Sequence, residues 1–402
     1  MLRISQYMKE LVDPKPLSAM RKPSAPVVIW NLLRRCNLTC KHCYSISADK
    51  DFPGELSTQE IFDVMEDLRA FGVPALILSG GEPLLRPDIF EISARAKELG
   101  FYLGLSSNGT LIDQDTIGDI ARVGYDYVGI SIDGMRETHD EFRRKQGSYD
   151  QALRGIRLCR DAGVKVGVRF TLTMDNVSEL PALLQLVKHE RIDKFYLSHL
   201  NYAGRGNKNR GTDVYHTITR EVMTQIFDTC WQDMVQDQGR EYISGNNDAD
   251  GVFFLQWVAE HHADKYAYME QRLRQWGGNA SGVNIANIDN LGHVHPDTFW
   301  WDYNLGNVRE TPFSDIWRDS DDPLMQGLRM QPRPLKGRCA ICQHQAICGG
   351  NTRVRAWKLT GDPWQEDPAC YLEDSEIGIA ESGGRRVQLT PWSKDERGQV
   401  LA

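Results

Sequence analysis

Three cysteines near the start of the chain have the type and spacing of metal ligands: Cys36-Asn-Leu-Thr-Cys40-Lys-His-Cys43. A 4Fe–4S cluster has four irons and normally takes four protein thiolates. A set of three therefore leaves one iron open to another ligand. An open position is typical of a metal site that does chemistry rather than one that only holds the fold. The alternative is a zinc knuckle, although only His42 lies nearby as a further donor.

A second cysteine group stands near the end of the chain and contains Cys339, Cys342, Cys348 and Cys370. Four thiolates can fill every iron of a cluster, so this set predicts a closed site. A zinc site stays open as an alternative, because C-x2-C units are common in zinc proteins. Clustered cysteines in a long chain without a secretory signal indicate metal ligands rather than disulfides. The remaining Cys159 and Cys230 are interpreted as buried thiols.

Composition narrows the class of protein. The chain has 402 residues, of which 41% are hydrophobic and 25% charged, and its formal net charge is -8. These values are ordinary for a soluble globular protein and give no support for nucleic-acid binding. There is no run of eighteen apolar residues, so we expect no membrane span. Met1 to Pro26 carry no apolar signal core, so we expect a cytoplasmic protein.

From about Pro26 to Leu200, short apolar runs alternate with helical patterns. The predicted strands are 27–32, 75–78, 102–106, 127–132, 164–172 and 194–198, and the predicted helices are 57–71, 87–99, 113–123, 149–162 and 177–190. Ser57-Thr-Gln-Glu60 predicts a capping box at a helix start. The alternation predicts an α/β fold with a parallel sheet and crossover helices. Six units are too few for a closed eight-stranded barrel, so we expect an open, partial (β/α)6 barrel of the TIM type.

Polar motifs follow the first four predicted strands in order. After the cysteine motif come Gly80-Gly81-Glu82-Pro83, Ser106-Ser107-Asn108-Gly109-Thr110 and Ser131-Ile132-Asp133-Gly134. Loops that follow parallel strands meet at the carboxyl edge of the sheet, where sites form. Paired glycines allow a close backbone approach, Glu82 can bind an ammonium group, and Arg143 downstream can pair with a carboxylate.

Together these motifs resemble the radical S-adenosylmethionine (SAM) superfamily over about Val27 to Ser198. The resemblance implies a 4Fe–4S cluster on Cys36, Cys40 and Cys43, with SAM on the open iron. It implies that SAM is cleaved to a 5′-deoxyadenosyl radical that abstracts a substrate hydrogen. The residues implied to bind SAM are, for its methionine part, Gly80, Gly81, Glu82 and Arg143 and, for its ribose, Ser106, Asn108, Ser131 and Asp133. Family members usually carry an aromatic residue at the position of His42.

The second cysteine group resembles the SPASM/twitch extension of that superfamily. The full pattern has seven cysteines and two auxiliary clusters, but Asp297 and Thr352 stand at two of the cysteine positions. The resemblance therefore implies one auxiliary 4Fe–4S cluster, held by Cys339, Cys342, Cys348 and Cys370. We expect five segments: an N-terminal extension (1–25), the barrel (26–215), a helical linker (216–276), the cluster extension (277–374) and a C-terminal tail (375–402).

Within the superfamily, the chain is similar to the branch that acts in heme d1 biosynthesis. This implies an iron-containing, siroheme-derived tetrapyrrole that loses propionate side chains, and a flavodoxin- or ferredoxin-type electron donor. Such a macrocycle needs cations and flat apolar walls. The candidate substrate contacts are a basic loop after the sixth strand and three histidines for the iron: Arg205, Lys208, Arg210, His199, His293 and His295. The candidate walls are Trp257, Trp276, Phe299, Trp300 and Trp301.

Other interpretations stay open. A basic, glycine-rich loop is often a solvated turn, aromatic residues are often core, and a single histidine is often structural. Within the resemblance, the chain could be a heme synthase-type propionate decarboxylase or a peptide maturase with a SPASM extension. A short N-terminus leaves little room for the peptide-binding domain that a maturase would carry. Outside the resemblance, it could be a scaffold protein that holds zinc or iron–sulfur clusters without catalysis.

Overall fold

The computed structural model describes residues 1–17, 25–318, 320–382, 385–388, 393–394 and 400–401. Parts of the predicted N-terminal extension and C-terminal tail, namely 18–24 and several stretches after 382, lie outside the described residues. The chain divides into two compact units. We call the first, Lys22–Asp213 with Ser281–Gln326, the barrel unit, and the second, Met1–Arg21 with Val214–Ala280 and Gly327–Ala402, the helical unit. The boundaries predicted from sequence motifs group the chain differently and stay a prediction.

The barrel unit is built on a sheet whose main strands are parallel. In order they are β1 (Val27–Asn31), β2 (Ala75–Ser79), β3 (Tyr102–Ser107), β4 (Tyr127–Ser131), β5 (Val166–Leu172) and β6 (Lys194–His199). On the other side of β1, β8 (Ile285–Ile288) pairs in parallel, and β9 (Val294–His295) pairs antiparallel to β8. Within the described residues this sheet is open, which confirms the predicted partial barrel.

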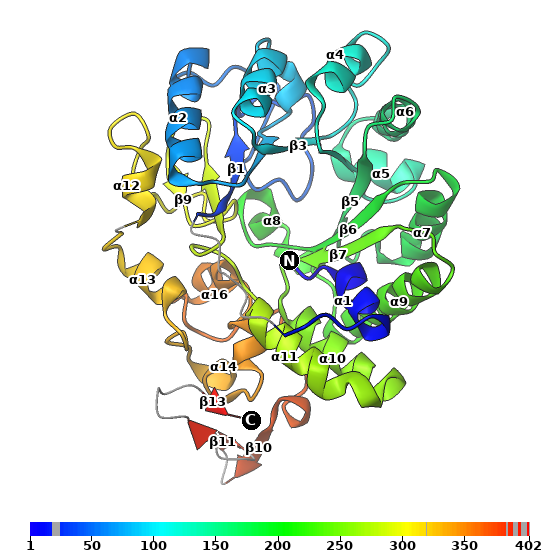
Figure 1. Cartoon of the computed structure of the whole chain (residues 1–402), viewed down its shortest axis with the longest axis vertical. Coiled ribbons are helices and arrows are strands. Elements are labelled where there is room, and N and C mark those ends of the chain that lie inside the picture. Colours follow the sequence, from blue (N-terminus) through cyan, green and yellow to red (C-terminus); the bar gives the residue numbers. More distant parts are fainter. Residues whose placement is uncertain (18–24, 319, 383–384, 389–392, 395–399, 402) are drawn as a thin grey trace. The chain divides into compact units, whose positions relative to one another are not determined.

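Helices lie outside the strands of the barrel unit (Figure 1). They are α2 (Thr58–Phe71), α3 (Ile89–Glu98), α4 (Thr116–Val123), α5 (Arg136–Arg143), α6 (Ser148–Asp161) and α7 (Leu180–His189). The capping box at α2 is confirmed, because Ser57 Oγ accepts from Glu60 N and Ser57 N donates to the Glu60 carboxylate at 2.7 Å. Shorter helical segments are η1 (Pro83–Leu85), η2 (Val177–Glu179) and α12 (Phe313–Arg318), and α13 (Pro323–Arg329) spans the boundary between the units.

The basic stretch after β6, predicted as a glycine-rich loop, instead forms α8 (Gly204–Lys208) and η3 (Arg210–Thr212). Its glycines serve close packing. A Cβ at Gly204 would lie 2.2 Å from Tyr44 O, and one at Gly206 would lie 2.5 Å from Asn201 O. Gly204 therefore allows α8 to pack closely against the loop that carries Cys36, Cys40 and Cys43 (residues 32–57, here called the cysteine loop), and Gly206 allows close packing within its own segment.

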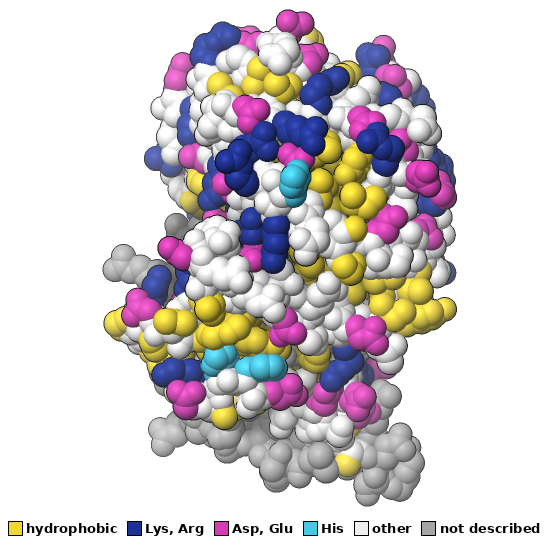
Figure 2. Space-filling model, turned by 90° about the vertical axis from the view of Figure 1, so that its right-hand side faces the viewer, with side chains coloured by type: hydrophobic (Ala, Val, Ile, Leu, Met, Phe, Trp, Pro, Cys, Tyr) yellow, Lys and Arg dark blue, Asp and Glu magenta, His cyan; other side chains and the backbone are white. Residues whose placement is uncertain are grey.

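The helical unit holds the remaining elements: α1 (Ile4–Val12), α9 (His216–Val235), β7 (Glu241–Gly245), α10 (Ala249–His261), η4 (Ala263–Lys265), α11 (Tyr266–Trp276), α14 (Gly337–Ile341), α15 (Gln345–Cys348), α16 (Arg353–Thr360), η5 (Ser375–Ile377), β10 (Ile379–Ser382), β11 (Arg385–Gln388), β12 (Ser393–Lys394) and β13 (Val400–Leu401). Its core includes stacked and edge-on contacts among Phe227, Phe254 and Trp257. No helix in the described part of the chain has the length and apolarity to cross a membrane. On the face shown in Figure 2, basic side chains stand among acidic ones.

Candidate functional site

The cysteine loop leaves the carboxyl end of β1 and folds back on itself. Cys36 N donates to Ala48 O at 3.0 Å, and Lys41 N donates to Phe142 O at 3.0 Å. Cys36 and Cys40 are buried beside Leu38, and Cys43 packs against them. The structure thus brings the three candidate ligands together where β1 ends.

Each of the three thiols has a polar neighbour from another part of the barrel unit or the loop itself. Arg143 Nη1 lies 3.4 Å from Cys40 Sγ. Asn108 Nδ2 lies 3.9 Å from Cys36 Sγ, and Ser45 Oγ lies 3.4 Å from Cys43 Sγ. These donors can stabilise thiolates or the sulfur atoms of a bound cluster.

The surroundings shift the thiol pKa values in different directions. Burial raises the pKa of Cys36 and of Cys40, and the Arg143 charge opposes the rise at Cys40. At Cys43, burial also acts to raise the pKa, but the Arg205 charge and hydrogen bonds from serines outweigh it, and the pKa lies below its ordinary value. A lowered pKa favours the thiolate, which is the form that binds iron.

Arg205, which lies on α8, donates three hydrogen bonds to backbone carbonyls of the cysteine loop. Its Nε donates to Cys40 O at 2.7 Å, and its Nη1 donates to Ser47 O at 3.0 Å. Its backbone N donates to Cys43 O at 2.8 Å. Lys208 and Arg210, the other two candidate cations, are exposed, and Arg210 donates to Asn207. Arg205 is thus directed at the cysteine loop, a contact that joins residues far apart in the sequence.

Gly80 and Gly81 let the loop after β2 pack against the cysteine loop. Gly81 N donates to Leu33 O at 2.7 Å, and Glu82 N donates to Arg35 O at 2.9 Å. A Cβ at Gly81 would lie only 2.0 Å from Arg35 O. A larger residue there would have to displace one of the two loops, so these glycines position the cysteine loop.

Glu82 is completely buried and joins the loops after β2 and β3. One carboxylate oxygen accepts from Ser107 Oγ at 2.7 Å, and the other accepts from Asn108 N at 2.7 Å. Burial raises the pKa of Glu82 to about 7, against the lowering effect of these hydrogen bonds. Asn108 also joins the loop after β3 to the cysteine loop, because its Nδ2 donates to Asn37 Oδ1 at 2.8 Å.

Asp133 and Arg143 form a buried ion pair beyond the end of β4. Asp133 also accepts from Thr171 N at 2.7 Å and so ties β4 to β5. Because Arg143 also contacts Cys40 Sγ, the pair connects the sheet with the cysteine loop. Arg143 Nε is buried and has no hydrogen-bond partner among the described residues, so one donor is left for a bound acceptor.

Arg169 on β5 is a site residue that sequence reasoning missed. Its guanidinium donates to Ser106 Oγ and lies over the Tyr196 ring at 5.3 Å. Ser131, at the end of β4, lies opposite Arg169 in the β4–β5 register and is half-buried. The available signal was a charged side chain within the mainly apolar run Val166–Leu172, because central parallel strands are usually apolar throughout.

His42 occupies the position where an aromatic residue is usual and behaves like one. Its ring stacks on Phe142, with centroids 4.8 Å apart and planes 28° apart. Burial lowers the pKa of His42 to about 4, so its ring is neutral near pH 7. The imidazole therefore packs as a flat ring between the cysteine loop and α5.

The second cysteine group lies in the helical unit around α14 and α15. Cys339, Cys342, Cys348 and Cys370 are all half-buried. Burial raises the pKa of each. The charges of Cys339 and Cys370 further raise the pKa of Cys342 and of Cys348, and that of Cys339 raises the pKa of Cys370, which reflects their proximity. The positive charges of Arg338 and Arg353 oppose the rise at Cys370 and Cys339. His344 N also lies 3.4 Å from Cys342 Sγ.

Two positions where the extension often has cysteine carry other hydrogen-bonding roles. In the barrel unit, Asp297 accepts from Ser281 Oγ and from Phe299 N. In the helical unit, Thr352 Oγ1 donates to Asn246 O at 3.2 Å. Both side chains are buried. Among the described residues, no three His, Cys, Asp or Glu side chains converge tightly enough for a single metal ion.

The candidate iron contacts differ in accessibility. His199 and His295 are buried, and His295 Nδ1 lies 2.7 Å from Tyr303 O. His293 is about one-third exposed.

Among the candidate walls of the barrel unit, Trp300 is buried, whereas Phe299 and Trp301 are half-buried. The centroids of the Phe299 and Trp301 rings lie 5.6 and 5.9 Å from that of Tyr44.

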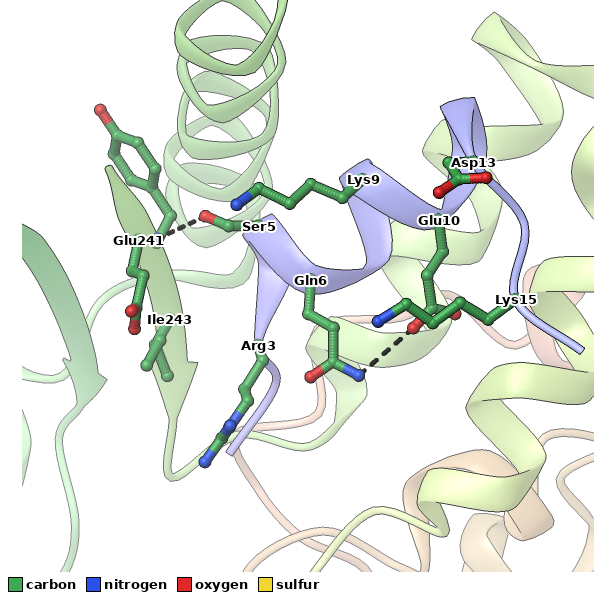
Figure 3. Close-up of a pocket in the computed structure, with 10 residues that line it drawn as sticks. Arg3, Ser5, Gln6, Lys9, Glu10, Asp13, Lys15, Glu241 and Ile243 are labelled. Atoms are coloured by element: carbon green, nitrogen blue, oxygen red, sulfur yellow. Dashed lines mark hydrogen bonds between the residues drawn. The ribbon is translucent and has the colours of Figure 1, made fainter. Parts of the chain in front are cut away.

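The other candidate walls, Trp257 and Trp276, belong to the helical unit. Trp257 is buried in its core, and Trp276 packs against Gly251. A hollow of about 520 Å³ in this unit lies between α1 and β7 and has mixed charge (Figure 3). Its Glu10 already pairs with Arg272 at 2.6 Å, and none of the candidate site residues lines it.

Comparison with known proteins defines the class. Residues 30–187 match the radical SAM superfamily, a range that contains the cysteine loop, Glu82 and Arg143. The chain belongs to this superfamily. Within it, the chain is 54% identical, over 94% of both chains, to the pre-heme d1 synthase of Dinoroseobacter shibae. It is 41% identical, over 95% of this chain and 96% of the other, to the Fe-coproporphyrin III synthase of Methanosarcina barkeri.

A solved structure shares the fold. Streptococcus suis SuiB bound to S-adenosylmethionine superposes with a TM-score of 0.66 at 18% identity, covering 87% of this chain and 78% of SuiB. At this identity the likeness concerns the fold alone. Membership of the superfamily implies a 4Fe–4S cluster and SAM, and the buried thiols with their cationic neighbours have the donor chemistry for that cluster.

Proposed function

We propose that this protein is a radical SAM enzyme of heme d1 biosynthesis that starts the removal of propionate side chains from an iron-containing, siroheme-derived tetrapyrrole. One observation carries the proposal: the near full-length identity of 54% to a protein named pre-heme d1 synthase. The relative at 41% identity is also named for a tetrapyrrole, Fe-coproporphyrin III. Both names support a substrate of the tetrapyrrole class.

In this proposal Cys36, Cys40 and Cys43 hold the first 4Fe–4S cluster. When bound there, the cluster and SAM supply an electron and a 5′-deoxyadenosyl radical that abstracts hydrogen from a propionate carbon. Arg143 stabilises the thiolate of Cys40, because its guanidinium contacts the sulfur, and the charge of Arg205 stabilises the thiolate of Cys43. The burial of the loop limits the access of water to the thiols.

The SAM contacts proposed from the family pattern are compatible with the observed hydrogen bonds. Glu82 would accept from the methionine amino group beside Gly80 and Gly81 through Oε2, which has two lone pairs and accepts only from Asn108 N, whereas Oε1 already accepts from Ser107 Oγ and Leu84 N. Arg143 Nε is available for the methionine carboxylate. The groups proposed to lie near the ribose are those of Ser106, Asn108, Ser131 and Asp133.

We further propose that Cys339, Cys342, Cys348 and Cys370 hold a second 4Fe–4S cluster. After hydrogen abstraction, cleavage of the carbon–carbon bond to the ring would release the side chain as acrylate and leave an unpaired electron on the macrocycle, and this cluster is the proposed acceptor of that electron. The charges of Arg338 and Arg353 near the thiols support a negatively charged cluster. A flavodoxin- or ferredoxin-type protein is the proposed source of the electron that starts the reaction.

The test is anaerobic reconstitution with iron and sulfide, followed by incubation with SAM, dithionite and one candidate substrate at a time. The candidates are an iron–siroheme derivative, Fe-coproporphyrin and a set of peptides. The proposal expects mass loss from the siroheme derivative together with formation of 5′-deoxyadenosine. Conversion of Fe-coproporphyrin or a peptide alone would favour the alternative enzymes, and absence of 5′-deoxyadenosine under all conditions would exclude radical SAM catalysis.

A further inference from the structure

His293 stands in a turn that fixes one nitrogen of its ring. The buried Asp289, just after β8, accepts from Leu291 N and His293 N through the same carboxylate oxygen, at 2.9 Å each. Its other oxygen lies 3.1 Å from His293 Nδ1. The His293 side chain is 33% exposed, and among the described residues its Nε2 has no hydrogen-bond partner.

This arrangement is the one that a metal-binding histidine needs. A carboxylate that accepts a hydrogen bond from Nδ1–H keeps the ring proton on that nitrogen, which fixes the tautomer and leaves the Nε2 lone pair available. Heme iron is commonly held by a single histidine in this manner. Because Asp289 is itself held by two backbone amides, it can keep the imidazole in one orientation.

The position of His293 relates it to the cysteine loop through aromatic contacts within the barrel unit. Tyr44 directly follows Cys43 and contacts the Trp301 ring at 5.9 Å. The Trp301 ring stacks on His295 at 6.0 Å, and the His295 ring lies 6.4 Å from that of His293. The half-buried rings of Tyr44 and Trp301 offer apolar surface between the loop and His293.

Neither of the other two candidate histidines meets these requirements. His295 is 1% exposed, its Nδ1 faces Tyr303 O, and its Nε2 lies 3.6 Å from the same Asp289 carboxylate. His199 is buried at the end of β6. His293 alone of the three combines a fixed ring with an accessible nitrogen.

We propose that His293 is the axial ligand of the substrate iron, with Nε2 bound to the metal and Asp289 holding Nδ1. This inference rests on the proposed function, because it requires an iron tetrapyrrole as substrate. Ligation through the iron would set how deeply the macrocycle sits and which of its faces meets His293. It also predicts a preference for the iron-containing macrocycle over its metal-free form.

The experiment measures binding of iron–siroheme and of metal-free sirohydrochlorin to the reconstituted full-length protein, by absorption and electron paramagnetic resonance. We expect His293→Ala to bind iron–siroheme at least about tenfold more weakly and to lose the nitrogen-ligand signature. Binding of sirohydrochlorin should not change. Added imidazole should restore the signature in His293→Gly, a result that a purely structural role would not give.

His189→Ala is the matched control, since His189 is an exposed histidine in the last turn of α7 of the same unit. It should bind both macrocycles as the wild type does. Equal affinity and equal spectra of wild type and His293→Ala with iron–siroheme would overturn the ligation while leaving the proposed function intact. If the wild type bound neither macrocycle, the proposed function and the ligation would both fail.

Discussion

The buried ion pair between Arg355 and Asp367 is expected to decide whether the second cysteine group can bind a cluster. Both side chains are fully buried, and two hydrogen bonds of 2.9 Å join the guanidinium to the carboxylate. Asp367 also accepts from Ala369 N at 2.9 Å, and Cys370 N donates to Asp367 O at 3.1 Å. Arg355 lies on α16, shortly after Cys348. The pair therefore holds Cys370 close to the other three thiols.

Replacing Arg355 by Met would leave the Asp367 carboxylate buried and unpaired. Breaking a buried pair in this way costs about 3–5 kcal/mol. That cost should raise the equilibrium constant for opening of the 353–372 segment by about a hundred- to several-thousand-fold, which hydrogen exchange followed by mass spectrometry would detect as faster exchange. After reconstitution we expect iron content to fall from about eight to about four atoms per chain, because only the first cluster remains.

A control variant and a double variant separate this effect from a general loss of stability. Lys336→Met breaks the exposed Lys336–Asp362 pair near the same cysteines and should change stability by no more than about 1 kcal/mol. Adding Asp367→Leu to Arg355→Met removes the unpaired charge and should restore part of the protection. If Arg355→Met kept both the wild-type exchange rate and the wild-type iron content, the role assigned to the pair would be refuted.

Three further predictions concern the barrel unit. Gly81→Ala should prevent binding of the first cluster but not of the second, because its Cβ would clash with Arg35 O. The reconstituted variant should therefore contain half as much iron as the wild type. Arg205→Ala should raise the pKa of Cys43 and shift cluster assembly to higher pH, measured by iron uptake between pH 6 and 9. The folded pKa of Glu82, about 7, is raised from 4.5, so the stability from its neutral form is complete below about pH 4.5 and is lost as pH rises through about 7. In cofactor-free protein, Glu82→Gln should therefore reduce the loss of stability between pH 5 and 8 by about 2.5 kcal/mol, measured by denaturant titration.

The sequence alone predicted most of the barrel. The strands β1 to β6 follow from short apolar runs between helical patterns, and the glycine after α2 adopts a positive φ of 93°, as expected for a helix end. The added strand β8 could not be predicted, because its pairing with β1 joins segments about 250 residues apart and four residues carry little local signal. Similarly, α8 is too short and too rich in glycine for a helical pattern to show.

The candidate ligands could be chosen from the sequence, but their partners could not. Cysteine spacing is a local property, so Cys36, Cys40 and Cys43 are recognisable at once. The contacts that Arg143 and Arg205 make with Cys40 span 103 and 165 residues and exist only once the sheet has formed. From the sequence alone, an arginine that binds substrate or cofactor therefore looks the same as one that binds a loop of the protein itself.

The central claim is that the radical formed at the cysteine loop acts on a tetrapyrrole propionate. The most direct measurement uses an iron–siroheme derivative with deuterium on its propionate carbons and follows the label by mass spectrometry. We expect one deuterium in 5′-deoxyadenosine from the wild type and no 5′-deoxyadenosine from Cys40→Ala. Abundant 5′-deoxyadenosine without deuterium, from an unchanged tetrapyrrole, would contradict it.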